Sequence, residues 1–201
     1  MRKALENPPT KEKLMSAAQR LILAKGFEGT SVDEVCRCAR LTKGSFFHYF
    51  DSKDALGLEL LTRYCEAAGK GFAGCCSPAA EKDPLKRVYK LLDFIAEKSK
   101  IMGSCGCLLG SMSQELADSN EKVRALADRS FSAMSRAIAA DLAQAKKKYA
   151  PRASFDPREL ADQLVSLMQG GALLAKVRKD SSIAAANLRH FRNYLKVLYG
   201  R

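Results

Sequence analysis

The sequence predicts an all-α fold of about nine helices. Apolar residues recur at i, i+3, i+4 and i+7 through almost the whole chain, which is the pattern of helices with one buried face. Residues that typically start helices precede many of these segments, and no segment alternates between apolar and polar residues as a half-buried strand would. We therefore expect helices packed on helices, with no sheet.

The first helices are short and carry clear start and stop signals. A first helix ends at Gly26 and buries one stripe of residues: Leu14, Ala17, Ala18, Leu21 and Ile22. A second begins after Ser31, which forms a capping box with Glu34 because each side chain can satisfy the other's backbone N–H. Its buried face comprises Val32, Val35, Cys36 and Ala39. A helix this short needs partners to be stable.

A third short helix follows a tight turn. Thr42 is its expected cap, and Leu41 with Phe46 form a hydrophobic staple across the helix start. Phe46 and Phe50 share the buried face, which leaves basic and aromatic side chains pointing away from the core. Two short helices joined by a tight turn, the second bearing such residues, are typical of a helix-turn-helix that reads DNA.

In these segments the chain resembles the tetracycline-repressor (TetR) family of bacterial transcription regulators. The matching motifs are Gly26-Phe27, Thr30-Ser31-Val32, Thr42-Lys43-Gly44-Ser45-Phe46-Phe47-His48-Tyr49-Phe50 and Asp51-Ser52-Lys53-Asp54-Ala55-Leu56. They cover about the first quarter of the chain. The resemblance implies a helix-turn-helix domain over residues 1–52 and a helical effector-binding and dimerisation domain over residues 53–201.

Two positions depart from the family pattern. Arg40 stands where the family usually has glycine, so either the turn avoids a positive φ or it carries strain of about 1 kcal/mol. Phe47 stands where the family often has a tyrosine whose hydroxyl reaches a DNA phosphate.

A helix-turn-helix places its second helix in the major groove and holds phosphates with the flanking residues. We accordingly expect Thr42, Lys43 and Ser45 at or near base edges, and Gly44 to allow close approach. Phosphate or sugar contacts are expected from Thr30, His48, Tyr49 and Lys53, and Phe47 belongs to the expected DNA-binding set without the tyrosine hydroxyl. The alternative is that the aromatic residues form only a hydrophobic cluster, with Lys43 and Lys53 as ordinary solvated charges.

Six further helices are expected downstream. One runs from about Lys53 to the segment Gly69–Gly74, and residues 71–83 form a loop. Asp83 and Pro84 then start a helix, residues 102–105 form a loop, and a short helix includes Leu108, Leu109, Met112 and Leu116. A long helix from Asp118 or Ser119 to about Tyr149 faces inward with Val123, Leu126, Ala127, Ser130, Met134, Ala137, Ile138 and Leu142. Residues 151–156 interrupt it.

The last two helices have broad apolar faces and start at Asp156-Pro157 and at Asp180. In proteins that resemble this family, the final two helices form a four-helix bundle with those of a second subunit. The expected dimer interface comprises Leu160, Leu164, Leu167, Met168, Gly171, Leu174, Phe191, Tyr194 and Leu195. A two-fold dimer would read a roughly palindromic double-stranded DNA operator. The alternative is that both helices only complete the core of the monomer.

In the family an unknown small effector would enter the helical body and move the fourth helix. Candidate sensor residues are Met102, Cys105, Cys107 and Met112. Two of them are thiols near a helix start, which favours the reactive thiolate, and Cys107-Leu-Leu-Gly resembles a segment of electrophile-responsive family members. The alternative is that Cys107 is a small buried apolar residue.

Composition limits other functions. The net charge of +12 suits a polyanion, yet residues 1–53 carry ten Lys/Arg and six Asp/Glu, a balance of only +4, so charge does not locate the DNA site. The downstream basic residues indicate a solvated helix face or, alternatively, a second nucleic-acid surface.

Thiols at Cys36, Cys38, Cys75, Cys76, Cys105 and Cys107 leave metal sensing open, but their spacing does not favour a metal site. We expect no metal, no cofactor and no enzyme activity, since catalytic motifs are absent; a helical enzyme or interaction module is the remote alternative. Without a signal peptide or membrane span, a cytoplasmic location is expected.

Overall fold

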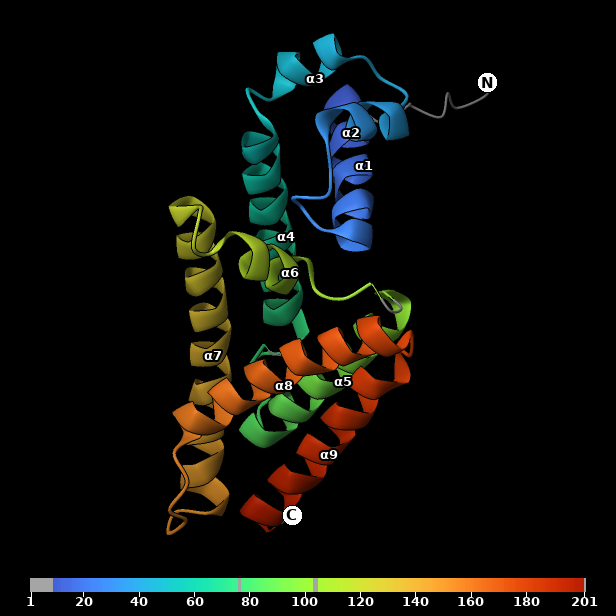
Figure 1. Ribbon diagram of the computed structural model, residues 1–201. Helices are drawn as coiled ribbons and strands as arrows, with labels where there is room; N and C mark the ends of the chain where they lie inside the picture. The colour runs from blue at the N-terminus through green and yellow to red at the C-terminus, as the bar shows by residue number, and fades with distance from the viewer. Residues whose placement is uncertain (1–8, 76, 103–104, 201) are drawn as a thin grey trace, which may run out of the picture.

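The computed structural model describes residues 9–75, 77–102 and 105–200, without the side chains of Cys75 and Met102. Over these residues the fold has nine helices and no strand, which confirms the predicted class (Figure 1). The helices are α1 (Thr10–Lys25), α2 (Val32–Ala39), α3 (Lys43–Tyr49), α4 (Lys53–Cys75), α5 (Pro84–Met102), α6 (Leu108–Leu116), α7 (Glu121–Tyr149), α8 (Pro157–Arg178) and α9 (Ser182–Tyr199).

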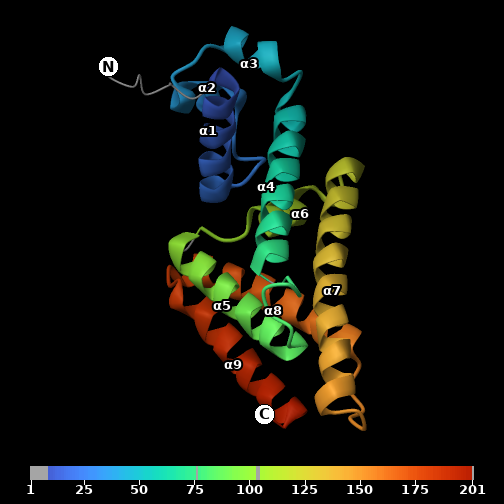
Figure 2. The same ribbon diagram turned by 180° about the vertical axis from the view of Figure 1, so that it is seen from behind.

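The molecule is elongated, with α1–α3 at one end and α5, α8 and α9 at the other (Figure 1). Helix α4 runs from the first group toward the second, and α6 lies against its middle. Seen from behind, α5 passes in front of α8 and runs beside α9, and α7 extends along one side (Figure 2). The expected helix-turn-helix thus projects from a helical body.

Most helix starts follow the predicted caps. The capping box of Ser31 with Glu34 forms, Thr42 accepts a hydrogen bond from the Ser45 N–H, and the Asp83 carboxylate accepts from the Leu85 N–H. The Asp156 carboxylate likewise accepts from the Arg158 N–H at the start of α8. These local side chains decide where the chain enters each helix.

Four boundary or facing predictions were wrong. Residues 71–75 continue α4 instead of forming a loop, and Met102 ends α5. Helix α7 starts at Glu121, not at Asp118 or Ser119, because the side chain of Asn120 accepts from the Val123 N–H. Ala137 is exposed, since it lies on the outer face of α7.

Two hydrophobic cores lie at the two ends of the molecule. The first joins α1–α3 to the first half of α4, α6 and the start of α7; its largest fully buried side chains include Leu14, Ile22, Phe27, Phe46, Leu61 and Met112. The second joins α5, the last half of α7, α8 and α9, around Leu92, Leu142, Leu164 and Leu195. The first core thus extends past residue 52, while the division at that residue remains a prediction.

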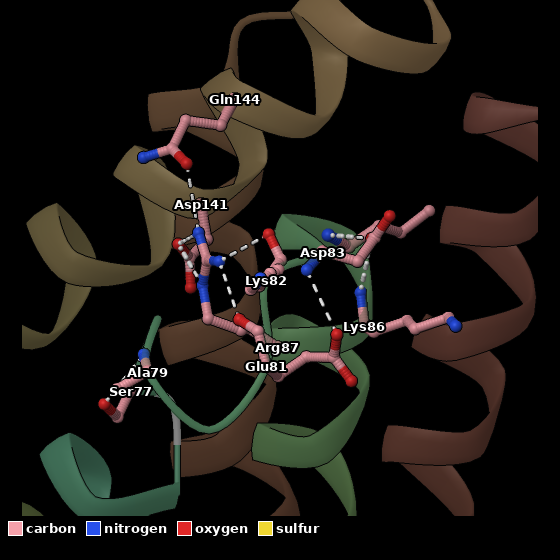
Figure 3. A network of polar contacts seen from close by, with 10 residues as sticks. Ser77, Ala79, Glu81, Lys82, Asp83, Lys86, Arg87, Asp141 and Gln144 are labelled. Carbon is pink, nitrogen blue, oxygen red and sulfur yellow. Dashed lines mark hydrogen bonds and ion pairs between the residues drawn. The ribbon is translucent and has the colours of Figure 1, made fainter.

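A buried ion pair joins α5 to α7, and its arginine also holds the segment before α5 (Figure 3). Arg87 is only 2% exposed, and its Nε and Nη2 donate to Oδ1 of Asp141 at 2.9 and 2.6 Å. Its Nη1 donates to the carbonyl oxygens of Glu81 and Lys82, and Nη2 also donates to Gln144. The guanidinium therefore fixes the connection between α4 and α5 in one place.

Candidate DNA-binding surface and effector cavity

Helix α3 presents its aromatic residues on two faces. Phe46 and Phe50 are 0% and 3% exposed and pack into the first core, whereas Phe47 and Tyr49 are 54% and 40% exposed. The His48 ring packs edge-on against Tyr49, with centroids 4.7 Å apart. Because α3 lies at the far end of the molecule, its outer face is open to a large partner (Figure 1).

The start of α3 carries the short polar groups expected near base edges. The Thr42 and Ser45 hydroxyls lie 3.0 Å apart, and Gly44 is exposed beside them. The Lys43 ammonium forms an exposed ion pair with Asp33 at 2.8 Å, and this hydrogen bond raises the pKa of Lys43. Lys43 is thus charged, on the surface and next to the hydroxyls.

Two side chains predicted to contact phosphate, Thr30 and Lys53, form hydrogen bonds within the protein. Thr30 is 3% exposed, and its hydroxyl donates to the carbonyl oxygen of Gly26 at 2.7 Å, so its side chain is not available to a phosphate. The Lys53 ammonium donates to the carbonyl oxygen of Phe27 at 3.2 Å and lies 4.4 Å from the centre of the Phe27 ring. Lys53 is partly exposed, so it retains only a limited surface for DNA.

The turn between α2 and α3 adopts the strained alternative. Arg40 has φ 56° and ψ 46°, the left-handed conformation that glycine would adopt freely. The next N–H, of Leu41, donates to the Cys36 carbonyl at 2.9 Å and closes the turn. The arginine therefore carries strain of about 1 kcal/mol but gains a basic, exposed side chain beside α3.

An apolar cavity of about 420 Å³ lies between the two cores. Its wall comes from α4, α5, α8, the start of α9 and the residues before α6, and includes Tyr64, Ala68, Phe72, Phe94, Lys98, Cys107, Leu167, Met168, Gln169 and Ala172. A cavity of this size and composition can hold a small, largely apolar molecule.

Of the three predicted sensor residues whose side chains the structure describes, Cys107 contributes to the cavity wall and Cys105 and Met112 do not. The Cys107 sulfur lies 3.8 Å from the Tyr64 hydroxyl, and burial, followed by the nearby thiol, raises the pKa of Tyr64. Cys105 is exposed outside the wall, and Met112 is 0% exposed in the first core, so Met112 cannot touch a cavity ligand. The Met102 side chain lies outside the described part of the structure. The same holds for the side chains of Cys75 and Cys76, which were among the possible metal-binding thiols.

The predicted dimer residues divide into three groups. Leu160, Leu164, Phe191 and Leu195 are at most 4% exposed and belong to the second core, so a partner cannot reach their side chains. Gly171 is buried against α9, and Leu167 and Met168 line the cavity. Leu174 and Tyr194 are 39% and 43% exposed. The prediction was wrong for the core residues because both faces of α8 and α9 are apolar in the sequence.

Sequence reasoning missed most of the cavity wall. Tyr64, Phe72, Phe94 and Gln169 are separated by up to about a hundred positions and have only the ordinary helical spacing of core residues. The local signal that pointed to Cys107 was the pair of thiols close to the expected start of α6.

Two family models match the chain. Residues 14–60 match "Bacterial regulatory proteins, tetR family", and residues 84–191 match "Tetracyclin repressor-like, C-terminal domain". Together they account for both the projecting helices and the helical body.

Individual proteins agree with these models. The transcriptional repressor NemR of Escherichia coli (strain K12) is 26% identical over 189 residues, covering 92% of this chain and 94% of NemR. The transcriptional regulator AcuR of Cereibacter sphaeroides is 30% identical over 171 residues, covering 83% of this chain and 76% of AcuR. A crystal structure of a regulatory protein TetR from Rhodobacter sphaeroides superposes with a TM-score of 0.81 at 26% identity, over 92% of this chain and 98% of that one.

None of the helices in the described ranges is both long and apolar enough to cross a bilayer. The matches extend over the helix-turn-helix and the body alike, and the proteins matched are regulators of transcription. The chain belongs to the TetR family of bacterial regulatory proteins and is a DNA-binding regulator of transcription.

Proposed function

We propose that the protein is a homodimeric repressor that binds a roughly palindromic operator in the cytoplasm and is released by a small effector in the cavity. The observation that carries this proposal is the exposed outer face of α3, with Lys43, Phe47 and Tyr49 displayed at the end of the molecule. Relatives named as transcriptional repressors support the direction of regulation.

The proposed DNA contacts follow the exposed groups. Thr42, Lys43 and Ser45 would lie near base edges, while His48 and Tyr49 would hold phosphate or sugar. Phe47 offers an apolar surface that can contact a thymine methyl group or a sugar. Thr30 is not among the proposed DNA contacts, because its side chain is buried. Lys53 mainly holds the Phe27 carbonyl oxygen within the protein.

The proposed dimer surface is an apolar stripe on the outside of α8 and α9. Leu173, Leu174 and Val177 are 48%, 39% and 69% exposed on α8, and Tyr194 and Val197 are 43% and 80% exposed on α9. Large apolar side chains left exposed on both helices are unfavourable in water, which favours a covering partner. A second copy of the same stripe would cover it about a two-fold axis.

Selection of duplexes from a random pool tests this function. We expect an enriched, roughly palindromic site whose half-sites lie about one helical turn or a multiple apart. Binding of the enriched duplex should fall steeply with salt, because phosphate contacts release counterions. Recovery of no sequence above background would contradict the proposal.

A second candidate for the effector response is a thiol switch at Cys107. The specific observation is that this thiol lies in the cavity wall beside Tyr64, and that a structure of the relative NemR is described as its reduced form. The thiol would lose its proton to solvent, and the thiolate would add to the activated C=C bond of an unsaturated carbonyl compound in the cavity. The S–C bond forms as the C=C π bond breaks, and the resulting enolate takes a proton from solvent.

Cysteine variants test this candidate. N-ethylmaleimide should release DNA from the wild-type protein and from Cys105→Ser, whose exposed thiol lies outside the cavity, but not from Cys107→Ser. Equal release of all three proteins would contradict a role for Cys107.

A further inference from the structure

A carboxylate in the body holds the loop between α1 and α2. Oε1 and Oε2 of Glu115, near the end of α6, accept hydrogen bonds from the N–H groups of Phe27 and Glu28 at 3.1 and 2.9 Å. Hydrogen bonds to an ionised acceptor are stronger than neutral ones, and two of them fix direction as well as distance. One side chain therefore connects α6 to the entry of the helix-turn-helix.

The loop is shaped to accept this carboxylate. Gly26 has φ +88°, and a Cβ at this position would lie 2.8 Å from Oε1 of Glu115. Any other residue would thus be strained and would push the carboxylate away from the Phe27 and Glu28 N–H groups. The glycine leaves room for the approach of α6.

The same loop is held from the opposite direction by α4. Lys53 donates to the carbonyl oxygen of Phe27, and the Phe27 ring packs so tightly on Gly57 that a Cβ there would lie 2.4 Å from a ring carbon. Helix α6 thus holds the N–H of Phe27, while α4 holds its carbonyl oxygen and its ring. The position of this one residue depends on how α4 and α6 lie relative to each other.

Both helices also reach the cavity. Tyr64, Ala68 and Phe72 of α4 line it, and so do Gly106 and Cys107, the latter the residue that precedes the first turn of α6. Helix α6 is one continuous nine-residue helix, and its apolar side is buried in the first core. A molecule that pushes on the Cys107 end therefore displaces the Glu115 end as well.

We propose that Glu115 is the positioning residue that transmits occupation of the cavity to the helix-turn-helix, by holding the N–H groups of Phe27 and Glu28. An occupant that separates α4 from α6 moves the two anchors of Phe27 apart and reorients α1–α3. This inference rests on the proposed function, since it assigns the route from the effector cavity to α3.

A double-mutant cycle tests the proposal without knowledge of the natural effector. Ala172→Trp fills the cavity from α8, and Glu115→Gln keeps the shape of the side chain but removes its charge and one acceptor. Glu121→Gln is the matched control, because it removes the same charge from an exposed side chain that pairs with Arg124 one turn along its own helix. Operator affinity is measured for each variant by fluorescence anisotropy, with the duplex selected from the random pool.

Glu115→Gln and Ala172→Trp are each expected to weaken operator binding about fivefold. The double variant is expected to bind the operator only slightly more weakly than either single variant. Hydrogen exchange of the Phe27 and Glu28 amides should speed up in both single variants and stay unchanged in Glu121→Gln. The exchange readout separates coupling from a general loss of stability, which would speed up exchange throughout the first core. If Ala172→Trp does not fold, Ala68→Phe fills the cavity from α4 and completes the same cycle.

Three results would overturn the proposal. The first is an operator affinity of Glu115→Gln equal to that of Glu121→Gln, and the second is full operator affinity in the cavity-filled protein. The third is a loss of affinity in the double variant equal to the product of the two single losses. Each of these presupposes that the wild-type protein binds its selected duplex. Failure of the wild-type protein to bind any duplex would instead contradict the proposed function itself.

Discussion

Charged side chains in this protein act in very different surroundings. Glu34 lies on the surface, where its carboxylate completes the cap of α2 and pairs with Lys25. Arg87 is enclosed, with every donor directed at Asp141, Gln144 or a backbone carbonyl. The first arrangement directs the entry to the helix-turn-helix, and the second fixes the connection between two long helices.

The contribution of Glu34 to stability should depend on pH. Its hydrogen bond from Lys25, followed by those from Ser31, lowers the pKa of Glu34 from 4.5 to about 2. A carboxyl whose pKa is lowered by folding contributes its full stabilisation of the folded state at pH values above its pKa in the unfolded protein. This contribution is lost as the pH falls toward its pKa in the folded protein. The difference in unfolding free energy between the wild type and Glu34→Gln should thus be constant above pH 4.5 and shrink between 4.5 and 2. Urea titrations across this range measure it, and a difference independent of pH would refute the assignment.

Removal of the partner of Arg87 should be costly. Asp141→Ala leaves a guanidinium that is 2% exposed without its counter-charge, and we expect a loss of about 3 kcal/mol in the free energy of unfolding. Asp128→Ala, at an exposed position of the same helix, is the control and should change stability little. Chemical denaturation compares them; equal losses would mean that the ion pair contributes nothing specific.

Helix starts were largely predictable, because they depend on side chains within a few positions. The caps at Ser31, Thr42, Asp83 and Asp156 all form as the sequence indicates. The end of α4 was predicted too early, since Gly69, Gly71 and Gly74 look like a loop in isolation. Packing of Phe72 against Phe94 of α5, with centroids 6.2 Å apart, accompanies the extra helical turn. Local sequence thus gives the start of a helix better than its end.

Two glycines of α4 should respond in opposite ways to alanine. Gly57 lies against the Phe27 ring, so a Cβ at 2.4 Å forces α4 and the loop apart, and Gly57→Ala should destabilise by about 1–3 kcal/mol. Gly69 has nothing within 4 Å of its Cβ position, so Gly69→Ala should stabilise the helix by about 0.5–1 kcal/mol. Thermal unfolding of the pair provides the comparison, and stabilisation by both substitutions would contradict the close packing of α4 on Phe27.

For the whole molecule, the sequence predicted the fold class but not which apolar helix faces are buried in the cores and which are exposed. Leu164 and Leu174 of α8 look alike in the sequence, yet Leu164 is buried in the second core and Leu174 is exposed. The cavity depends on side chains from helices far apart in the chain, and the contact between Glu115 and Phe27 spans 88 positions. Such long-range arrangements follow from packing and have no local signature.

The exposed stripe of α8 and α9 should determine the oligomeric state. Val197→Glu places a charge at a side chain that is 80% exposed, where it would be buried by the proposed partner, and we expect monomers. Ile101→Glu, at a 78% exposed apolar residue of α5, is the matched control and should leave the dimer intact. Sedimentation velocity distinguishes the two, and a dimeric Val197→Glu would exclude this surface as the interface.

The measurement that bears most directly on the central claim is the stoichiometry and affinity of binding to the selected operator. Anisotropy titrations with the full site, one half-site and a scrambled duplex should show two protomers on the full site and much weaker binding to the half-site. Lys43→Ala should reduce binding to the full site and lessen its salt dependence. Equal affinity for the full and scrambled duplexes, unchanged by Lys43→Ala, would show that α3 does not read DNA.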